Sequence, residues 1–222
     1  MINSLTKKGS LFLPENISGV LTQFDILFYV IFWLSVILLI GLLIVGIYFV
    51  VKGKRRSEDE LAKVQVTHNI KLEVIWTIIP TILVMIIFFW GFKEYIVMRT
   101  ANPNSIEIYA IGYKWNWVFE YPNGKTSEDL VVPANRPVKL IMTSEDVLHS
   151  FYMPNLRIKR DVIPKRYTTL PFEAKKLGRF RIFCTEYCGD QHSQMNAVLE
   201  VVSIEKYFDF IETEEFDDTV PL

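Results

Sequence analysis

Two long stretches without a charged side chain dominate the first half of the chain, at residues 26–51 and 74–92. At a rise of about 1.5 Å per residue, helices of these lengths would measure ~39 Å and ~28 Å, against a hydrocarbon core of ~30 Å. Trp76, Trp90 and Lys93 stand near the ends of the second stretch, where aromatic and cationic side chains anchor helices at a membrane interface. The pattern predicts two transmembrane helices.

Each stretch has an alternative interpretation. The second is short enough to be the buried core helix of a soluble protein, and the first lies near enough to the N-terminus to be a signal peptide. The first stretch begins too late and is too long for a signal peptide, however, and no small-residue cleavage site follows it. We therefore expect both stretches to remain in the chain as a helical hairpin over residues 26–92.

The charges around the two stretches predict the orientation of the hairpin. The intervening segment, residues 52–73, carries six basic and four acidic side chains, whereas the charges of residues 1–25 sum to zero and those of residues 93–222 to −3. Short loops rich in Lys and Arg stay on the cytoplasmic side. We therefore predict an inner (cytoplasmic) membrane protein with a cytoplasmic 52–73 loop and both termini on the outer side.

The second half of the chain changes to the period-two pattern of β-strands. Aromatic side chains occupy alternate positions from Tyr113 to Tyr121, and the Pro122-Asn-Gly sequence after them predicts a hairpin turn. Further alternating or apolar segments lie at residues 105–109, 138–142, 179–183 and 197–202. Short strands separated by Pro and Gly are typical of an all-β sandwich.

These patterns predict the domain organisation of a membrane-anchored mixed protein. An external segment, residues 1–25, precedes the hairpin, and a linker at 93–104 leads to a sandwich at 105–202. The last part, residues 203–222, is an acidic tail.

The composition limits the classes of function. A formal net charge of −1 offers no basic field for nucleic acid, and a hydrophobic fraction of 50% excludes a disordered chain. The 22% of charged residues are too many for a polytopic membrane bundle. With only two Cys and three His, any metal site must draw on very few side chains.

Both cysteines and two of the histidines fall into one pattern, His149…Cys184-x3-Cys188-x3-His192-x2-Met195. A disulfide between the cysteines would close only a tiny loop and would leave His192 and Met195 without a role. A zinc site is a second alternative, but zinc has no use for a thioether and usually takes two close pairs of ligands. Copper uses two His, Cys and a weak axial Met, and two thiolates can bridge two copper ions. The pattern favours copper.

Such a site is suited to one-electron transfer. Soft thiolates stabilise Cu(I) and share the charge of Cu(II), and a rigid sandwich holds the ligands in both redox states. The aromatic residues between 115 and 121 either form a route for the electron or fill the core, and the sequence alone favours the core.

Three motifs resemble one family. They are the run from Glu73 to Pro80 at the start of the second helix, the segment Lys114-Trp-Asn-Trp117, and the segment Ser144–Ser150 together with the cysteine loop. The chain resembles subunit II of the haem–copper cytochrome c oxidases, in the variety that has two transmembrane helices and a cupredoxin-like domain with a dinuclear copper (CuA) centre.

The resemblance implies metal ligands by position. The copper ligands would be the side chains of His149, Cys184, Cys188, His192 and Met195 and the backbone carbonyl of Glu186. The carboxylate of Glu186 would also bind a Mg²⁺ ion shared with subunit I.

The resemblance also implies roles in electron and proton transfer. Trp115 would be the residue at which the electron enters, and Glu73 would lie at the mouth of a proton pathway of subunit I. Glu120, Glu145 and Asp146 would belong to an acidic docking surface for a basic cytochrome. The family usually has Gln at the position of Lys114 and often an aromatic residue at that of Asn116, so the identity of the donor is left open.

The expected function is that of the electron-transfer subunit of a respiratory terminal oxidase, which is part of an enzyme but inactive alone. It would pass electrons from cytochrome c through the copper centre to haem in subunit I, where oxygen is reduced to water. The alternatives are a CuA-bearing subunit of a nitric oxide reductase and a membrane-tethered copper carrier. No Cys-x-x-Cys-His sequence is present, so no c-type haem is expected on this chain.

Overall fold

The computed structural model describes residues 9–18, 22–55, 57 and 68–213. The chain forms two compact units, of which one comprises residues 23–95 and the other combines the N-terminal segment with residues from 96 onward. Half of the predicted 52–73 loop and the end of the predicted acidic tail lie outside the described residues, as do parts of the segment 1–25.

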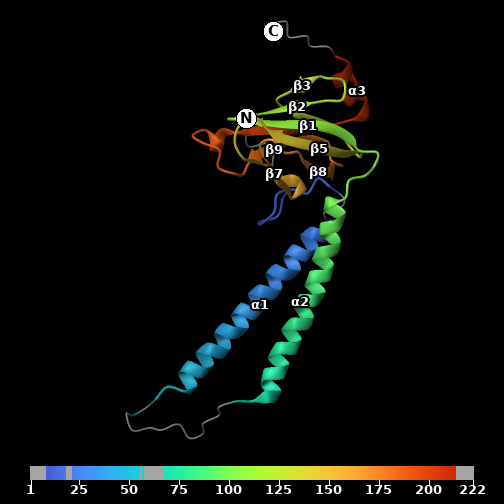
Figure 1. Cartoon of the computed structure of the whole chain (residues 1–222). Coiled ribbons are helices and arrows are strands. Elements are labelled where there is room, and N and C mark those ends of the chain that lie inside the picture. Colours follow the sequence, from blue (N-terminus) through green and yellow to red (C-terminus); the bar gives the residue numbers. More distant parts are fainter. Residues whose placement is uncertain (1–8, 19–21, 56, 58–67, 214–222) are drawn as a thin grey trace. The chain divides into compact units, whose positions relative to one another are not determined.

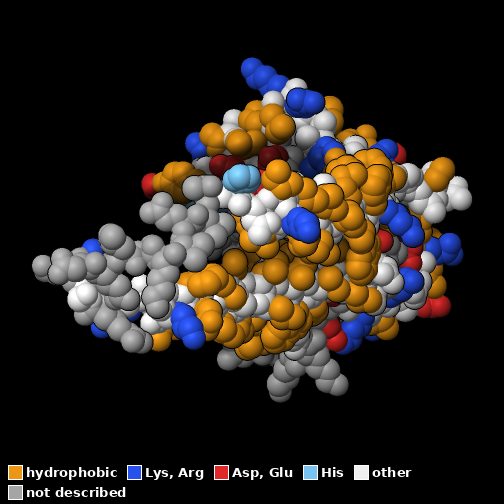
Figure 2. All heavy atoms as spheres, turned by 90° about the horizontal axis from the view of Figure 1, so that it is seen from below, with side chains coloured by type: hydrophobic (Ala, Val, Ile, Leu, Met, Phe, Trp, Pro, Cys, Tyr) orange, Lys and Arg blue, Asp and Glu red, His pale blue; other side chains and the backbone are white. Residues whose placement is uncertain are grey.

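The first unit contains nearly all of two long helices, α1 (Thr22–Lys52) and α2 (Ile70–Arg99). Each is long and apolar enough to cross a membrane, and most of their large apolar side chains are exposed rather than packed in a protein core. Hydrophobic side chains accordingly make up much of the face shown in Figure 2. These observations agree with the predicted pair of membrane helices, because a helix of this length with an exposed apolar surface fits the hydrocarbon core of a bilayer.

The second unit is a β-sandwich of two five-stranded sheets, in the orders β3-β2-β1-β5-β8 and β4-β10-β9-β6-β7. The first sheet contains β1 (Ile106–Tyr113), β2 (Asn116–Glu120), β3 (Thr126–Ser127), β5 (Pro137–Ser144) and β8 (Thr168–Glu173). The second contains β4 (Leu130–Pro133), β6 (His149–Met153), β7 (Ile158–Val162), β9 (Gly178–Cys184) and β10 (Asn196–Val202). Two 3₁₀ turns, η2 (Pro154–Leu156) and η3 (His192–Gln194), and helix α3 (Ile204–Glu212) complete the unit (Figure 1). The predicted sandwich is confirmed.

The alternating aromatic run does not form a single strand. β1 ends at Tyr113 and β2 begins at Asn116, and these two residues pair across the antiparallel ladder. Trp115 therefore lies in the turn between the strands, whereas Trp117 lies within β2. The period of two continues through the turn and hides it from an analysis of the sequence.

The core between the sheets is built on aromatic rings. Trp117, Phe119 and Phe151 are completely buried. The ring centroids of Trp117 and Phe151 lie 5.0 Å apart, and those of Phe119 and Phe151 lie 6.0 Å apart, in edge-to-face arrangements. Phe151 is two residues beyond His149 on β6, so this packing holds the strand that carries His149 rigidly in place.

The segment before α1 packs on the sandwich. Ile17 is buried, its backbone N–H donates to the carbonyl of Asn155 at 3.2 Å, and its carbonyl accepts from the N–H of Lys175 at 2.7 Å. The side-chain amide of Asn155 donates to the carbonyl of Glu15 at 2.9 Å. The segment 9–18 is thus held on the sandwich by hydrogen bonds of both the backbone N–H and the backbone carbonyl of Ile17.

Candidate metal centre

Two adjacent central strands carry the first pair of candidate ligands. His149 is the first residue of β6 and Cys184 the last residue of β9, and these strands pair with Phe151 opposite Cys184. The segment that follows, residues 185–195, is called the ligand loop below. It is closed at its base by a hydrogen bond of 3.0 Å from the N–H of Cys184 to the carbonyl of Met195. The loop therefore begins and ends at the same point of a rigid sheet.

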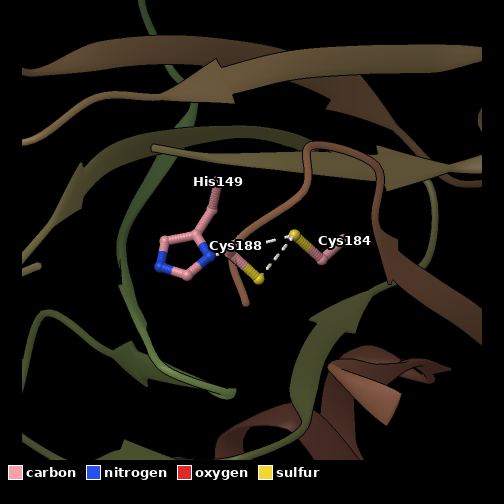
Figure 3. Close-up of side chains that lie close together, drawn as sticks. All are labelled: His149, Cys184 and Cys188. Carbon is pink, nitrogen blue, oxygen red and sulfur yellow. Dashed lines mark hydrogen bonds between the residues drawn. The ribbon is translucent and has the colours of Figure 1, made fainter. Parts of the chain in front are cut away.

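Two sulfur atoms form the centre of the site (Figure 3). The Sγ atoms of Cys184 and Cys188 lie 3.9 Å apart, and Nδ1 of His149 lies 3.8 Å from Sγ of Cys184. Both cysteines are free and buried, and His149 has no exposed surface. One possible ligand atom from each of these three residues lies within 4.8 Å of the other two.

The ligand loop brings three further donor groups to the sulfurs. Nδ1 of His192 lies 3.5 Å and Sδ of Met195 lies 3.7 Å from Sγ of Cys188. The backbone carbonyl oxygen of Glu186 lies 3.3 Å from Sγ of Cys184. The structure thus brings together all six groups that the sequence predicted as copper ligands, with one imidazole facing each sulfur.

The donor set fits copper. A metal–thiolate bond measures about 2.3 Å, so two sulfurs separated by 3.9 Å can bind the same ion. The imidazoles of His149 and His192, the thioether of Met195 and the backbone carbonyl of Glu186 would complete the set of donors around the two sulfurs. Thiolate and thioether sulfur are soft ligands that select copper over hard cations, and His149, Cys184, Cys188 and Met195 are buried.

The two thiols differ in acidity. Burial raises the pKa of Cys184, but hydrogen bonds to His149 and to the backbone of Ser150 outweigh it and lower that pKa to about 6. Burial and the nearby Cys184 sulfur raise the pKa of Cys188 to about 11. A metal that binds both sulfurs as thiolates must displace the proton of the less acidic Cys188. Metal affinity accordingly rises with pH.

Asp146 contacts the ring nitrogen of His149 that points away from the cysteine sulfurs. Its Oδ1 lies 2.8 Å from Nε2 of His149, and its Oδ2 accepts the backbone N–H of Lys114 at 2.6 Å. Although burial raises the pKa of the Asp146 carboxyl, the backbone N–H of Val147 and the contact with His149 lower it overall. A carboxylate that accepts a hydrogen bond from Nε2–H keeps the proton on that nitrogen and leaves the lone pair of Nδ1 free to bind a metal. Asp146, predicted for a docking surface, thus has its carboxylate engaged at the metal site.

The two tryptophans have different surroundings. Trp117 is completely buried, and its ring centroid lies 5.9 Å from that of His149. Trp115 is only partly buried and packs against the ligand loop at Gly189. The structure therefore separates a core tryptophan from one that reaches the surface.

The remaining predicted residues do not join this cluster. Glu145 is exposed in the turn before β6, and Glu120 is exposed at the end of β2 farther from the ligand loop. Glu73 lies in the first turn of α2, where its Oε1 accepts the backbone N–H of Asn69 at 3.4 Å.

Two glycines that the sequence analysis did not single out pack against functional side chains. A Cβ at Gly112 would lie 3.0 Å from Cδ2 of His149, and a Cβ at Gly189 would lie 3.2 Å from the indole of Trp115. Gly189 directly follows Cys188, which is the one sequence signal that could have indicated it. Nothing in the sequence pattern marks Gly112.

Two family models match the chain. The model described as cytochrome c oxidase subunit II, periplasmic domain, matches residues 124–202, and the one described as cytochrome c oxidase subunit II, transmembrane domain, matches residues 6–93.

Individual proteins give the same result. Cytochrome c oxidase subunit 2 of Metridium senile is 35% identical over 63% of this chain and 66% of its own length, so this chain spans just under two thirds of that relative. The protein of the same name from Vanderwaltozyma polyspora is 32% identical over 88% of this chain and 87% of its own length. Among solved structures, the periplasmic domain of cytochrome oxidase subunit II of Bradyrhizobium japonicum is 30% identical, with a TM-score of 0.48, and covers 51% of this chain and 95% of that one.

Proposed function

The chain belongs to the cytochrome c oxidase subunit II family, and from this premise we propose that it is the electron-transfer subunit of a respiratory terminal oxidase. It receives electrons from cytochrome c and delivers them, through a dinuclear CuA centre, to haem in subunit I, where oxygen is reduced to water. The chain is one part of the enzyme and has no activity alone.

The single observation that carries the proposal is the set of six donor groups around two buried sulfurs. His149, Cys184, Cys188, His192 and Met195 and the carbonyl of Glu186 would hold the copper. The bound copper pair would supply a one-electron redox centre. Because the strands β6 and β9 fix His149 and Cys184, the chain holds its ligands with little movement between redox states.

Four of the candidate ligands, His149, Cys184, Cys188 and Met195, are buried, which favours a fixed centre over a copper carrier. His149 is fully buried, and Cys188 is 4% exposed. A carrier must exchange its ion with other proteins and therefore needs accessible ligands. Nothing among the described residues favours a nitric oxide reductase over an oxidase.

Electron input is assigned to the surface that contains Trp115. This residue is partly exposed and contacts the ligand loop, and Glu145 lies in a neighbouring turn whose backbone bonds to Gly112. Glu145, with Asp146 and the more distant Glu120, would attract the basic surface of a cytochrome. Since both oxygens of Asp146 are engaged, its main part is to orient His149.

Two further roles involve subunit I. The carbonyl of Glu186 faces the sulfurs, which leaves its carboxylate to bind a Mg²⁺ ion shared with that subunit, because carboxylate oxygen is a ligand that Mg²⁺ prefers. Glu73, in the first turn of α2, would lie at the mouth of the proton pathway.

The chain is anchored in a membrane by its two helices, and its β-sandwich is on the outer side. We assign the chain to the inner membrane and both of its termini to the outer side, where the β-sandwich lies. The packing of the segment 9–18 on the sandwich supports this for the N-terminus, since Ile17 is bound to residues of the external unit.

Copper content and electron paramagnetic resonance test the function. The full chain, purified in detergent and loaded with copper, is expected to bind two copper ions per chain and to give a mixed-valence dicopper signal. One ion per chain, or preferential retention of zinc, would contradict the proposal. Met195→Leu serves as a variant that retains copper but shifts its potential, because an axial thioether is a weak ligand.

The docking surface is tested by charge reversal at Glu145. Glu145→Lys is expected to slow association with cytochrome c several-fold at low salt, and the difference should shrink as the Debye length falls to ~10 Å and below. Stopped-flow reduction at several ionic strengths measures this. Glu212→Lys is the matched control, because it changes the net charge equally at the end of α3, in the part of the unit that follows β10. Equal slowing by both variants would remove Glu145 from the docking surface.

A further inference from the structure

The indole of Trp115 lies directly on the backbone of the ligand loop at Gly189. A Cβ built on Gly189 would meet Cζ2 and Nε1 of Trp115 at 3.2 Å each and Cε2 at 3.5 Å. Contacts this short are unfavourable for a methyl group, so the indole reaches this position only because residue 189 has no side chain. The ring edge that carries Nε1 is the edge that faces the loop.

The backbone at Gly189 connects this contact to the centre of the site. Gly189 is bonded to Cys188, whose sulfur lies 3.9 Å from that of Cys184 and 3.5 Å from Nδ1 of His192. The carbonyl of Gly189 also accepts the N–H of His192 at 3.1 Å. One residue therefore touches Trp115 and is joined to two of the candidate ligands.

The indole N–H of Trp115 is buried without a hydrogen-bond partner among the described residues, as is that of Trp117 in the core. An unsatisfied buried donor costs about 1–3 kcal/mol. A phenylalanine at this position would avoid that cost but would lose packing, so hydrogen bonding does not explain the indole. Its larger ring provides contact area with the ligand loop instead.

A second connection runs through Asp146. The N–H of Lys114, next to Trp115 in sequence, donates to Asp146, which contacts His149. That connection begins at the peptide backbone and does not involve the indole ring, whereas the contact with Gly189 does. Of these two connections, the contact with Gly189 is the one that starts at the ring itself.

We propose that Gly189 is a positioning residue, which keeps the indole of Trp115 in van der Waals contact with the ligand loop so that an electron passes from the ring through the Gly189–Cys188 backbone to the sulfur. The inference rests on the proposed function. In this step the donor protein is oxidised by one electron and the copper pair is reduced by one. No bond forms or breaks, and no proton is transferred.

The test is Gly189→Ala in the assembled oxidase, alone and together with Trp115→Phe. With Trp115 present, the alanine methyl displaces the ring, and reduction of the copper by the donor protein is expected to slow at least about tenfold, within the range that a misplacement of about 1 Å causes. Phenylalanine lacks the atoms that the methyl would meet. In the Trp115→Phe background, Gly189→Ala is therefore expected to cause no further slowing.

Backbone strain needs a separate control, because Gly189 has φ +123° and any side chain is strained there. Strain at residue 189 is the same in both backgrounds, so the double-mutant cycle cancels it. Gly124→Ala adds a matched control, since Gly124 has φ +86° and a Cβ there would meet nothing within 4 Å. This variant is expected to leave the reduction rate unchanged.

A readout on the copper-free full chain completes the test. The fluorescence of Trp115 is the difference between a chain with Trp115 and the same chain with Trp115→Phe. Quenching of this fluorescence by acrylamide is expected to be stronger in the Gly189→Ala chain than in the parent chain, because the displaced ring is more exposed. The proposal is overturned if Gly189→Ala has the reduction rate and the quenching of the parent chain. It is also overturned if Gly189→Ala changes the reduction rate or the copper content equally in the presence of Trp115 and in the Trp115→Phe chain. If Trp115→Phe alone leaves the reduction rate normal, the electron does not enter at Trp115, and it is the proposed function that fails at this step.

Discussion

Replacing Cys188 by serine is expected to abolish the copper centre and, with it, electron transfer from the donor. Cys188 lies within 4 Å of three other candidate ligands, the sulfurs of Cys184 and Met195 and the imidazole of His192. Replacing a residue that only supports a metal ligand lowers metal affinity about 10–100-fold. Removing the thiolate of Cys188, itself a candidate ligand, is therefore expected to lower copper affinity by more than about 100-fold. Copper analysis and the absorption spectrum of the purified chain measure the loss.

The serine variant should fold, because the hydroxyl is slightly smaller than the thiol and the ligand loop remains closed by the hydrogen bond between Cys184 and Met195. A thermal melt of the copper-free protein checks this. A Cys188→Ser chain that still binds two copper ions with an unchanged spectrum would show that Cys188 does not bridge them.

Trp115→Phe is expected to lower the rate at which the donor reduces the copper by orders of magnitude, while small artificial reductants act at the normal rate. The phenyl ring is too short to keep the contact with Gly189. Stability should change by no more than about 1–2 kcal/mol, because the lost packing is offset by removal of a buried N–H that has no acceptor. Stopped-flow reduction and a thermal melt of the same preparation give both quantities.

Trp117→Phe is the matched control for this experiment. Trp117 is completely buried and packs on Phe151, so the same change is expected to destabilise the fold more. The rate of reduction per folded molecule should fall much less than in Trp115→Phe. If Trp115→Phe instead destabilises the protein and keeps a normal rate per folded molecule, Trp115 has no part in electron transfer.

The sequence predicted those features that depend on local pattern. The two membrane helices follow from the absence of charge over a length that matches a bilayer. The sandwich follows from the period of two, and the chemistry of the site from the spacing of two Cys, two His and Met195. These features could be predicted because each one is carried by neighbouring residues or by the scarcity of the residue types involved.

The end of one strand and the start of the next within the aromatic run from Tyr113 to Tyr121 could not be predicted in this way. The alternation of this run is continuous, yet the chain reverses between Tyr113 and Asn116. Trp115 and Trp117 therefore have different surroundings, one against the ligand loop and the other in the core. Side-chain alternation reports the local backbone conformation only and contains no information about where a strand ends.

The tertiary structure alone decided which residues support the metal site. Asp146 reads in the sequence as one of two exposed acids, but both of its oxygens are engaged, one with His149 and the other with the backbone of Lys114. Gly189 becomes significant only because the turn before β2 brings Trp115 against it. Hydrogen bonds and close contacts between segments more than 30 residues apart depend on how the sheets are stacked. The order of residues determined which candidate ligands the chain offers, and the packing of β1, β2 and the ligand loop determined what surrounds them.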